Sequence, residues 1–367
     1  MTHEFAIIRH NCTGAIYCFL VVTTLISAGC ATKDQREPAS ETPVEEKIFV
    51  PPVTDPASVF TPDPKSEKKP DTITFSQGIG TLQKTLRRVA EVSTANLVIM
   101  NGIEDIEIGE ARFTKSPLEA VVQHLTTVSG SAAYTGPHYT FLYPPGYEPL
   151  LETVVVGTLD PSYSDVRADF SFGSGLYLFN VFQWISEALG ITVIADNAVG
   201  QAECGELTLN QVPLDAALEA ILRSARVNEV RVESTGEYIF LFNPENRNPA
   251  SSMLNAVPPD AQQEANLNRI VHVYLPVPPK KDEPIEMLPD PTTLDKVLAP
   301  LSRQLGITVV AEPELAAFPI NPAVFHHVRV RTALDLIVRQ WLLADYGYQV
   351  TADRVVLRKR LPEEAIP

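Results

Sequence analysis

The chain has 367 residues, of which 45% are hydrophobic and 20% charged, and its formal net charge at pH 7 is −16. An acidic surface of this kind repels phosphate backbones, and no basic stripe offsets it, so we expect no nucleic-acid partner. Removal of residues 1–29 would take away one Glu and one Arg and would leave this charge unchanged.

The first 29 residues have the pattern of an export signal. Arg9 precedes an uncharged, mostly apolar run from Gly14 to Gly29. This run is shorter than the roughly 20 residues of a membrane-spanning helix, and it ends in small residues as cleaved signals do. We therefore predict a signal peptide over 1–29, with an uncleaved anchor helix as the alternative.

The end of this segment, SAGC at 27–30, resembles the lipobox of bacterial lipoproteins, in which the cysteine receives the lipid. The resemblance implies lipid attachment at Cys30. Ala31 is not the aspartate that resembles an inner-membrane retention signal, so we expect the periplasmic face of the outer membrane. Cys204 is then the one cysteine left over, so no internal disulfide framework is expected. A buried or loop thiol is the expectation for Cys204, and a reactive thiol is the alternative.

Residues 30–72 are rich in proline and in charges of both signs, with few large apolar side chains. A segment of this composition cannot bury enough surface to offset the entropy of ordering it. We predict a disordered linker that holds the folded part away from the membrane.

A repeat follows the linker. The heptapeptide GITVIAD at 190–196 returns as GITVVAE at 306–312, which is 116 residues further on. The match extends in both directions at this offset, through apolar residues at helical spacing that predict one helix before and one after the heptapeptide. The heptapeptide has no reactive group, and it predicts a buried strand after a helix that ends at Gly190 or Gly306. We interpret it as a packing element.

A fainter third copy lies upstream, where SPLEAVVQHL at 116–125 parallels VPLDAALEAIL at 212–222, each with a proline in the first helical turn. We predict an α+β fold of three tandem small β-α-β-β-α-β modules after the linker. The predicted boundaries are module 1 at 73–150, module 2 at 151–243, a connector with one strand at 244–289, module 3 at 290–360 and a tail at 361–367.

The connector contains one strand-like stretch at 269–275. A strand has to pair its backbone groups, so we expect this stretch to join a sheet edge of module 3. We expect the similar stretch 152–159 to do the same for module 2.

The run ADFSFGSGLYLFNVFQWISEALGITVIADNAVG at 168–200, followed by GELTLNQVPLDAALEAIL and EYIFLF, resembles the secretin and TonB N-terminal short domain. The resemblance is strong for module 2, fair for module 3 and faint for module 1. It implies docking to other envelope proteins and implies no enzyme. The chain does not continue into a secretin gate domain or a receptor barrel, so the expectation is an accessory lipoprotein.

The predicted function is a periplasmic scaffold or adaptor that docks onto a secretin-type secretion or type IV pilus assembly by protein–protein contacts. The alternative is a signalling or cell-wall-associated adaptor for a TonB-type transport regulator or for peptidoglycan. Ring-forming relatives make a ring-type homo-oligomer an open possibility.

Residue patterns of known chemistry are missing from the sequence. There is no H-E-x-x-H, no C-x-x-C and no G-x-S-x-G, so we predict no catalytic residue, no metal site and no cofactor. His326 and His327 are adjacent, and neighbours on a strand point to opposite faces, so we expect surface histidines and not a metal clamp.

Two tryptophans are the candidate docking residues, Trp184 and Trp341. Core or module-to-module packing is the plainer interpretation of both, but tryptophan is enriched at interaction hot spots. Trp184 lies beside the main apolar stripe of its predicted helix, so it is the better candidate of the two.

Overall fold

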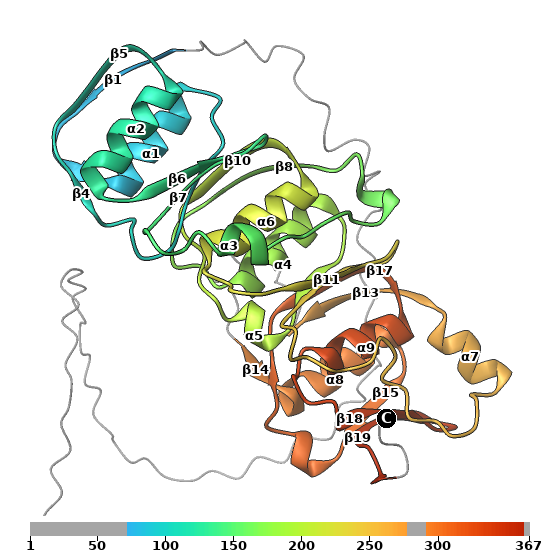
Figure 1. The fold of residues 1–367 in the computed structure, drawn as a ribbon. Coiled ribbons are helices and arrows are strands. Elements are labelled where there is room, and N and C mark those ends of the chain that lie inside the picture. The colour runs from blue at the N-terminus through green and yellow to red at the C-terminus, as the bar shows by residue number, and fades with distance from the viewer. Residues whose placement is uncertain (1–71, 277–290, 363–367) are drawn as a thin grey trace, which may run out of the picture. The chain divides into compact units, whose positions relative to one another are not determined.

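A computed structural model of the chain describes residues 72–276 and 291–362. The predicted signal peptide, Cys30 and nearly all of the predicted linker lie outside these described residues. The fold is mixed α+β, with helices packed against several small sheets (Figure 1). Across the described ranges, none of the helices combines the length and the apolar character needed to cross a membrane.

The first segment, residues 72–143, begins with a strand and alternates short helices with short strands. Thr81 begins the first helix as its N-cap, since its side chain accepts a hydrogen bond from the Lys84 amide, and Gly130 ends the second helix with φ 66°. Its elements are β1 Thr72–Gln77, β2 Gly80–Thr81, α1 Leu82–Val92, β3 Leu97–Ile99, β4 Glu107–Ile108, β5 Ala111–Pro117, α2 Leu118–Ser129, β6 Ala132–Thr135 and β7 Thr140–Tyr143.

The middle segment, residues 167–242, repeats the main elements of the first in the same order, with the short helix α5 added and without counterparts of β2 and β4. A short helix, α3 Leu150–Thr153, and a 3-10 turn, η2 Pro161–Tyr163, precede it. Its elements are β8 Arg167–Phe172, α4 Leu178–Leu189, β9 Val193–Ala195, α5 Asn197–Gly200, β10 Leu207–Pro213, α6 Leu214–Ser224, β11 Arg231–Ser234 and β12 Ile239–Phe242.

The last segment, residues 270–276 and 291–359, follows helix α7 Ala261–Leu267, whose N-cap Asp260 and Gln263 form a capping box. Its elements are β13 Ile270–Leu275, β14 Thr292–Thr293, α8 Leu294–Leu305, β15 Thr308–Ala311, η3 Pro313–Leu315, β16 Pro319–Ile320, β17 Ala323–Arg329, α9 Val330–Arg339, β18 Tyr346–Val350 and β19 Arg354–Lys359.

The repeated heptapeptide forms a strand in both copies. Strand β9 is buried as predicted, whereas in β15 Val309 alone is buried, so the prediction of a buried strand is wrong for the second copy. Gly190 and Gly306 end α4 and α8 in the left-handed conformation, with φ 64° and 60°. Ser186 on α4 then accepts the amide hydrogen of Val193 at 2.9 Å, and Ser302 on α8 accepts that of Val309 at the same distance. The helix, the glycine turn and the strand are therefore held together by one serine hydroxyl in each copy, buried at Ser186 and partly buried at Ser302.

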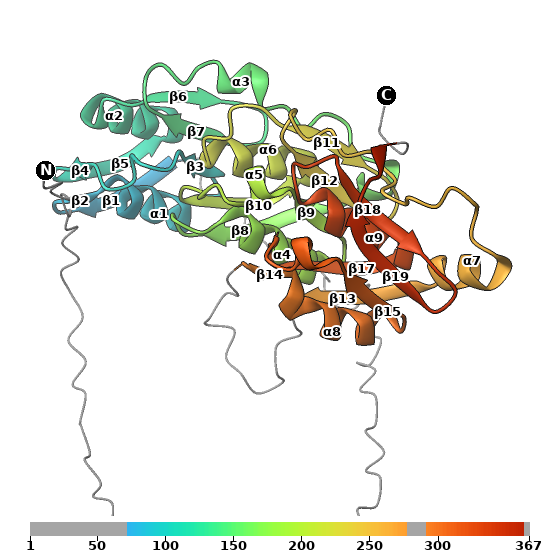
Figure 2. The same cartoon turned by 90° about the horizontal axis from the view of Figure 1, so that it is seen from below.

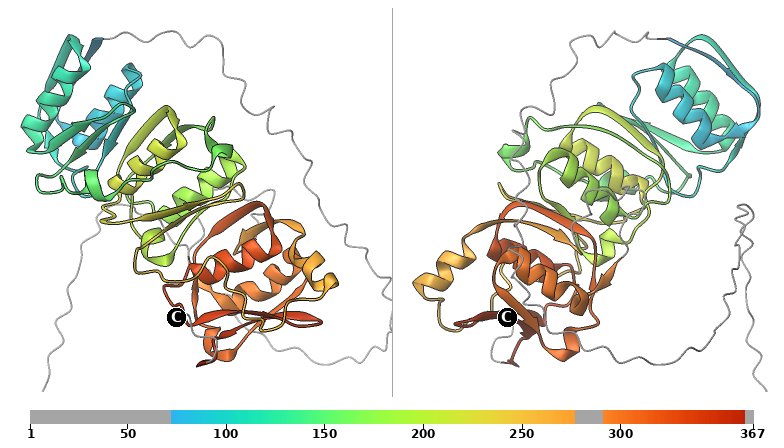
Figure 3. Two further views of the ribbon diagram at one scale, coloured as in Figure 1. Left: turned by 45° about the vertical axis from the view of Figure 1, so that its right-hand side comes forward. Right: turned by 180° about the vertical axis from the view of Figure 1, so that it is seen from behind.

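Each segment has two main sheets, and the first and last segments also contain a short antiparallel pair, β2–β4 and β14–β16. The first main sheet is antiparallel and joins the first strand to the strand before the second helix, in the pairs β1–β5, β8–β10 and β13–β17. The second main sheet has three strands, in the orders β6-β7-β3, β11-β12-β9 and β18-β19-β15, with one parallel pair each. The two helices of a segment lie side by side between its two sheets (Figures 1 and 3).

The prediction for the connector strand is confirmed, because β13 pairs antiparallel with β17 of the last segment (Figure 2). The prediction for 152–159 is wrong. Residues 150–153 form helix α3, and 154–159 form no strand. Val154 and Val156 are nevertheless buried in the hydrophobic cluster of the middle segment, so the apolar pattern of this stretch reflects packing without sheet pairing.

The described residues form three hydrophobic clusters within one compact unit. These clusters do not match the expectation of three modules that each close around an interior of their own. Val98 of the first segment lies in the cluster of the middle segment, and Ile194 of the middle segment lies in that of the last. The three-stranded sheets of the first and middle segments thus contribute one face to their own core and the other face to the next.

Candidate docking surfaces

The first and middle segments share a sheet. Leu97 and Val98 of β3 pair antiparallel with Thr208 and Leu207 of β10, and the Ile99 amide donates to the Glu206 carbonyl at 2.7 Å. This pairing joins a three-stranded and a two-stranded sheet into one of five strands, in the order β6-β7-β3-β10-β8. Backbone pairing of this kind fixes the register between the two segments.

An asparagine after the inner strand makes the same contacts at both junctions. The amide N–H of Asn101 donates to the Ser224 carbonyl, and that of Asn197 donates to the Gln340 carbonyl, each at 2.8 Å. The side-chain amides donate to loop carbonyls of the next segment, at 3.1 Å from Asn101 to Glu203 and 3.4 Å from Asn197 to Pro319. The same backbone and side-chain hydrogen bonds of an asparagine therefore recur at both junctions.

A bulge in the next segment is held by a second polar side chain. Asn96 accepts the amide hydrogen of Asn210 at 2.7 Å, and Thr192 accepts that of His326 at 2.8 Å. The residue after each bulge position has a positive φ, 54° at Gln211 and 51° at His327. A non-glycine residue rarely adopts this conformation. Lys115, at the equivalent position of the first segment, has φ 50°, so the bulge recurs in all three segments and two of its copies are used at the junctions.

A buried arginine at the end of the second helix completes each junction. Arg223 on α6 donates to the hydroxyl of Tyr139 at 2.7 Å. Arg339 on α9 forms two hydrogen bonds to the Glu233 carboxylate, at 3.0 and 2.6 Å, and lies 4.3 Å from the ring centroid of Phe240. Both side chains are almost fully buried, at 4% and 3% exposure.

Arg223 and Arg339 were not among the residues predicted from the sequence, although the sequence contains a signal for them. They lie 116 residues apart, which is the offset of the repeat. Each is followed by a polar residue, although the end of a helix that packs against a core is expected to carry an apolar residue there. A charge that recurs at the repeat offset on a buried helix end indicates a contact with the neighbouring copy.

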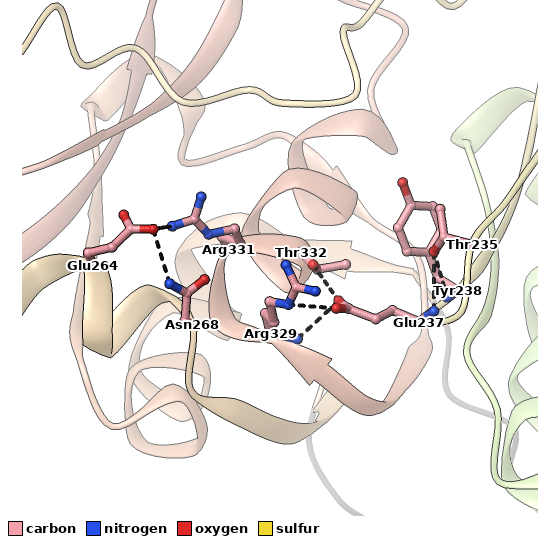
Figure 4. Close-up of polar contacts among 8 residues, drawn as sticks. All are labelled: Thr235, Glu237, Tyr238, Glu264, Asn268, Arg329, Arg331 and Thr332. Carbon is pink, nitrogen blue, oxygen red and sulfur yellow. Dashed lines mark hydrogen bonds and ion pairs between the residues drawn. The ribbon is translucent and has the colours of Figure 1, made fainter. Parts of the chain in front are cut away.

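A more exposed ion pair flanks the second junction (Figure 4). Glu237, in the turn between β11 and β12, forms an ion pair with Arg329 at 2.7 Å and accepts a hydrogen bond from Thr332 at 2.7 Å. Within the last segment, Glu264 of α7 accepts from Arg331 at 2.5 Å and from Asn268 at 3.0 Å. These contacts tie α7 and the β11–β12 turn to α9.

Trp184 lines a shallow hollow on the middle segment. Its ring stacks on Phe172, with 5.6 Å between centroids and an interplanar angle of 25°. The hollow has a volume of about 430 Å³, and Trp184 is partly exposed in it. Its other lining residues are Asp169, Phe170, Ser171, Glu187 and Ala188.

The strand beside this hollow is a sheet edge. Strand β8, which carries Phe170 and Phe172, pairs on one side with β10, and within the described residues its other side has no strand partner. An unpaired edge offers backbone donors and acceptors in a row, so it is a template for a strand of another chain. The edge, the aromatic hollow and the carboxylates of Asp169 and Glu187 thus meet at one place.

Trp341 does not line an exposed surface in the same way. Its side chain is 3% exposed, its indole N–H donates to the Pro319 carbonyl at 2.8 Å, and Phe318 packs edge-on against it. Burial of this degree favours the plainer interpretation of Trp341 as a packing residue, and its role in docking stays a prediction.

Two groups with possible reactivity have structural surroundings. Cys204 is buried, and burial raises the pKa of its thiol to about 12, far above that of a reactive thiolate. Asp196 is buried as the N-cap of α5, where it accepts hydrogen bonds from the amides of Val199 and Asn243 and from the side chain of Asn246. Asp196 therefore stabilises the turn after the inner strand.

His326 and His327 lie on the bulge of β17, His326 partly buried and His327 exposed. The ring of His326 lies 4.4 Å from that of His272. Among residues 72–276 and 291–362, no group of three or more His, Cys, Asp or Glu is placed to hold a metal ion.

Stability should depend on pH through His326. Burial, with the charges of His272 and His327, lowers the pKa of His326 to about 4. The unfolded chain binds this proton near pH 6.5, so the contribution is complete above that pH and is lost as pH falls towards 4. We expect about 1–2 kcal/mol after allowance for partial exposure. The variant His326→Asn carries the residue that the middle segment has at the equivalent position, Asn210. In urea unfolding, the free energy of unfolding of this variant should no longer fall between pH 6.5 and 4. A pH dependence equal to that of the wild type over this range would contradict the assignment.

Comparison of the chain with protein-family models, with curated proteins and with solved structures finds no match.

Proposed function

We propose that the segments 72–143, 167–242 and 270–359 are three copies of one module of the secretin and TonB N-terminal short type. The protein is then a lipid-anchored periplasmic scaffold that docks onto a secretin-type secretion or pilus assembly. The recurrence of the same main strands and helices, the same two main sheets and the same junction contacts supports the tandem arrangement. A rigid array suits a scaffold because it holds its docking surface at a fixed distance from its anchor.

The observation that carries the proposal is the hollow beside β8. Phe170 and Trp184 offer an apolar anchor site of a size that takes one large side chain, and the β8 edge offers backbone hydrogen bonds in register with it. The carboxylates of Asp169 and Glu187 at the rim favour a partner strand with a basic residue next to its apolar one. We place the contact with the envelope machine here.

Replacement of Trp184 should weaken docking without unfolding the chain. Trp184→Ala removes the anchor wall of the hollow, and hot-spot tryptophans typically contribute 2 kcal/mol or more, so we expect about a thirtyfold loss of affinity. The measurement is recovery of the secretin with the tagged full-length protein from detergent-solubilised envelopes. Val155→Ala is the matched control, because Val155 is an exposed apolar residue of the same region outside the hollow.

Equal recovery of the secretin with wild type, Trp184→Ala and Val155→Ala would refute this docking site. Recovery of a transport regulator or of peptidoglycan fragments in place of a secretin would favour the alternative adaptor function. A thermal unfolding midpoint close to that of the wild type shows that Trp184→Ala retains its fold.

Lipid attachment is tested separately at Cys30. We expect wild type to incorporate labelled palmitate and to sediment with outer membranes, and Cys30→Ser to lose both properties, since several acyl chains at about 0.8 kcal/mol per buried methylene make attachment stable. Membrane association of an unlabelled Cys30→Ser protein would indicate an anchor of another kind.

A further inference from the structure

The last segment leaves open a sheet face that the other two segments cover. In the first and middle segments, Phe141 and Phe240 point away from their own cores and are fully buried in the hydrophobic cluster of the next segment. Val356 of β19 stands at the same register position, opposite Val310 of β15. Both valines are partly exposed, and among the described residues no further segment packs over them.

The correspondence of positions follows from the sheet registers. Phe240 pairs with Ile194 in the middle segment, and Val356 pairs with Val310 in the last. On the other side, Phe240 pairs with Glu233 and Val356 pairs with Gln349. The open face of the last segment is therefore the counterpart of the face that Arg339 covers.

The open face carries a positive charge at a position where the closed junctions have a neutral tyrosine. At the closed junctions this face offers acceptors to the incoming arginine, the hydroxyl of Tyr139 and the carboxylate of Glu233. Tyr139 and Tyr238 have equivalent positions in the first and middle segments. On the open face, Arg354 has this position. Gln349 has the position of Glu233. The side chain of Arg354 is 52% exposed, and its ion pair with the neighbouring Asp353 is long, at 3.8 Å.

The backbone contacts are altered as well. Thr308 retains the position of Thr192, whose side chain holds the bulge of the next segment. Pro313 replaces Asn197, and a proline cannot donate the hydrogen bond that crosses both closed junctions. The open face therefore keeps the threonine that holds a bulge of the next segment, but it lacks the backbone donor of the closed junctions. A partner that needs this donor is excluded.

We propose that this open face, formed by Val310, Val356, Arg354 and Thr308, binds a helix of another protein. That helix carries a carboxylate where α6 and α9 carry Arg223 and Arg339, so that it pairs with Arg354 while its apolar side chains cover the two valines. A second copy of this chain does not fit, because α2 has Thr127 at the arginine position and Pro313 lacks the donor. The proposal does not involve the hollow beside Trp184, so either site can fail without the other.

The test is site-specific photo-crosslinking of the full-length protein in the cell that makes it. A photoreactive benzoyl-phenylalanine at position 356 should form a crosslink that mass spectrometry maps to a helix of a different protein, next to an Asp or Glu. The same probe at Ile79, an exposed apolar position of the first segment, is the control and should not reach that helix.

Charge reversal decides whether Arg354 recognises the carboxylate. Arg354→Glu should lower the crosslink from position 356 by about tenfold, since loss of a close charge pair at an interface costs 1.4 kcal/mol or more. Arg303→Glu, which reverses an exposed charge on α8, should leave it unchanged. A crosslink to a second copy of this chain, a crosslink to an extended strand, no crosslink beyond the Ile79 control, or no effect of Arg354→Glu would each overturn the proposal.

Discussion

Arg339→Ala is expected to lower the free energy of unfolding by about 3 kcal/mol, because it leaves a partly buried carboxylate without its partner. The guanidinium is 3% exposed and the Glu233 side chain 29% exposed, so water screens their two hydrogen bonds poorly. The variant also loses the contact of the cation with the ring of Phe240. Urea-induced unfolding at pH 7, followed by circular dichroism, measures the change.

The control for this prediction lies at the same junction. Arg329 forms its ion pair with Glu237 at the surface, where its own side chain is 51% exposed. Surface pairs contribute roughly 0–1 kcal/mol, so Arg329→Ala should have little effect. Similar losses for Arg329→Ala and Arg339→Ala would show that the buried arginine is not what holds the last segment to the middle one.

Phe240→Ala is expected to cost about 3–5 kcal/mol, the usual range for removal of a buried phenylalanine. Phe240 belongs to β12 of the middle segment, but its fully buried ring lies in the cluster of the last segment and stacks on Phe242 at 5.1 Å. The cavity therefore opens between two segments, and the last segment should become the first part to unfold. Limited proteolysis together with urea unfolding reports both effects.

Val356→Ala is the matched comparison, since Val356 has the same register position on the open face of the last segment. It is partly exposed and lies outside the hydrophobic clusters, so its truncation should cost less than about 1 kcal/mol. A loss at Val356 equal to that at Phe240 would mean that an unrecognised part of the chain covers the open face.

Local patterns in the sequence were sufficient for most elements of the fold. The repeat at an offset of 116 residues predicted the paired helices, the glycine turns at Gly190 and Gly306 and the strands that follow these turns. The strand at 270–275 was also predicted, because an isolated apolar alternation has to pair with a sheet. Such features depend on neighbours within about 15 residues, which a single sequence displays.

The junctions could not be predicted in this way. Pairing of β3 with β10 joins residues more than 100 positions apart, and nothing in either strand identifies the other. At 152–159 a strand was predicted that does not form. Its buried Val154 and Val156 alternate as strand residues do, but they pack on the core without pairing.

The same limit applies to the candidate docking residues. Trp184 and Trp341 both lie on or next to predicted helices, and periodicity alone does not show which one remains at the surface. Trp341 is covered by Phe318 and by the carbonyl of Pro319, which starts β16 and lies 22 residues earlier in the chain. Trp184 stays accessible because β8 is the last strand of its sheet.

Hydrogen exchange at the amides of Asn101 and Asn197 tests the central claim most directly, because both N–H groups donate across a junction, to Ser224 and Gln340. If the three segments form one array, both amides exchange as slowly as the buried strands β7 and β12 beside them, through global unfolding only. Exchange of either amide about a hundredfold faster than those strands would show that the segments separate at that junction, and would contradict the account.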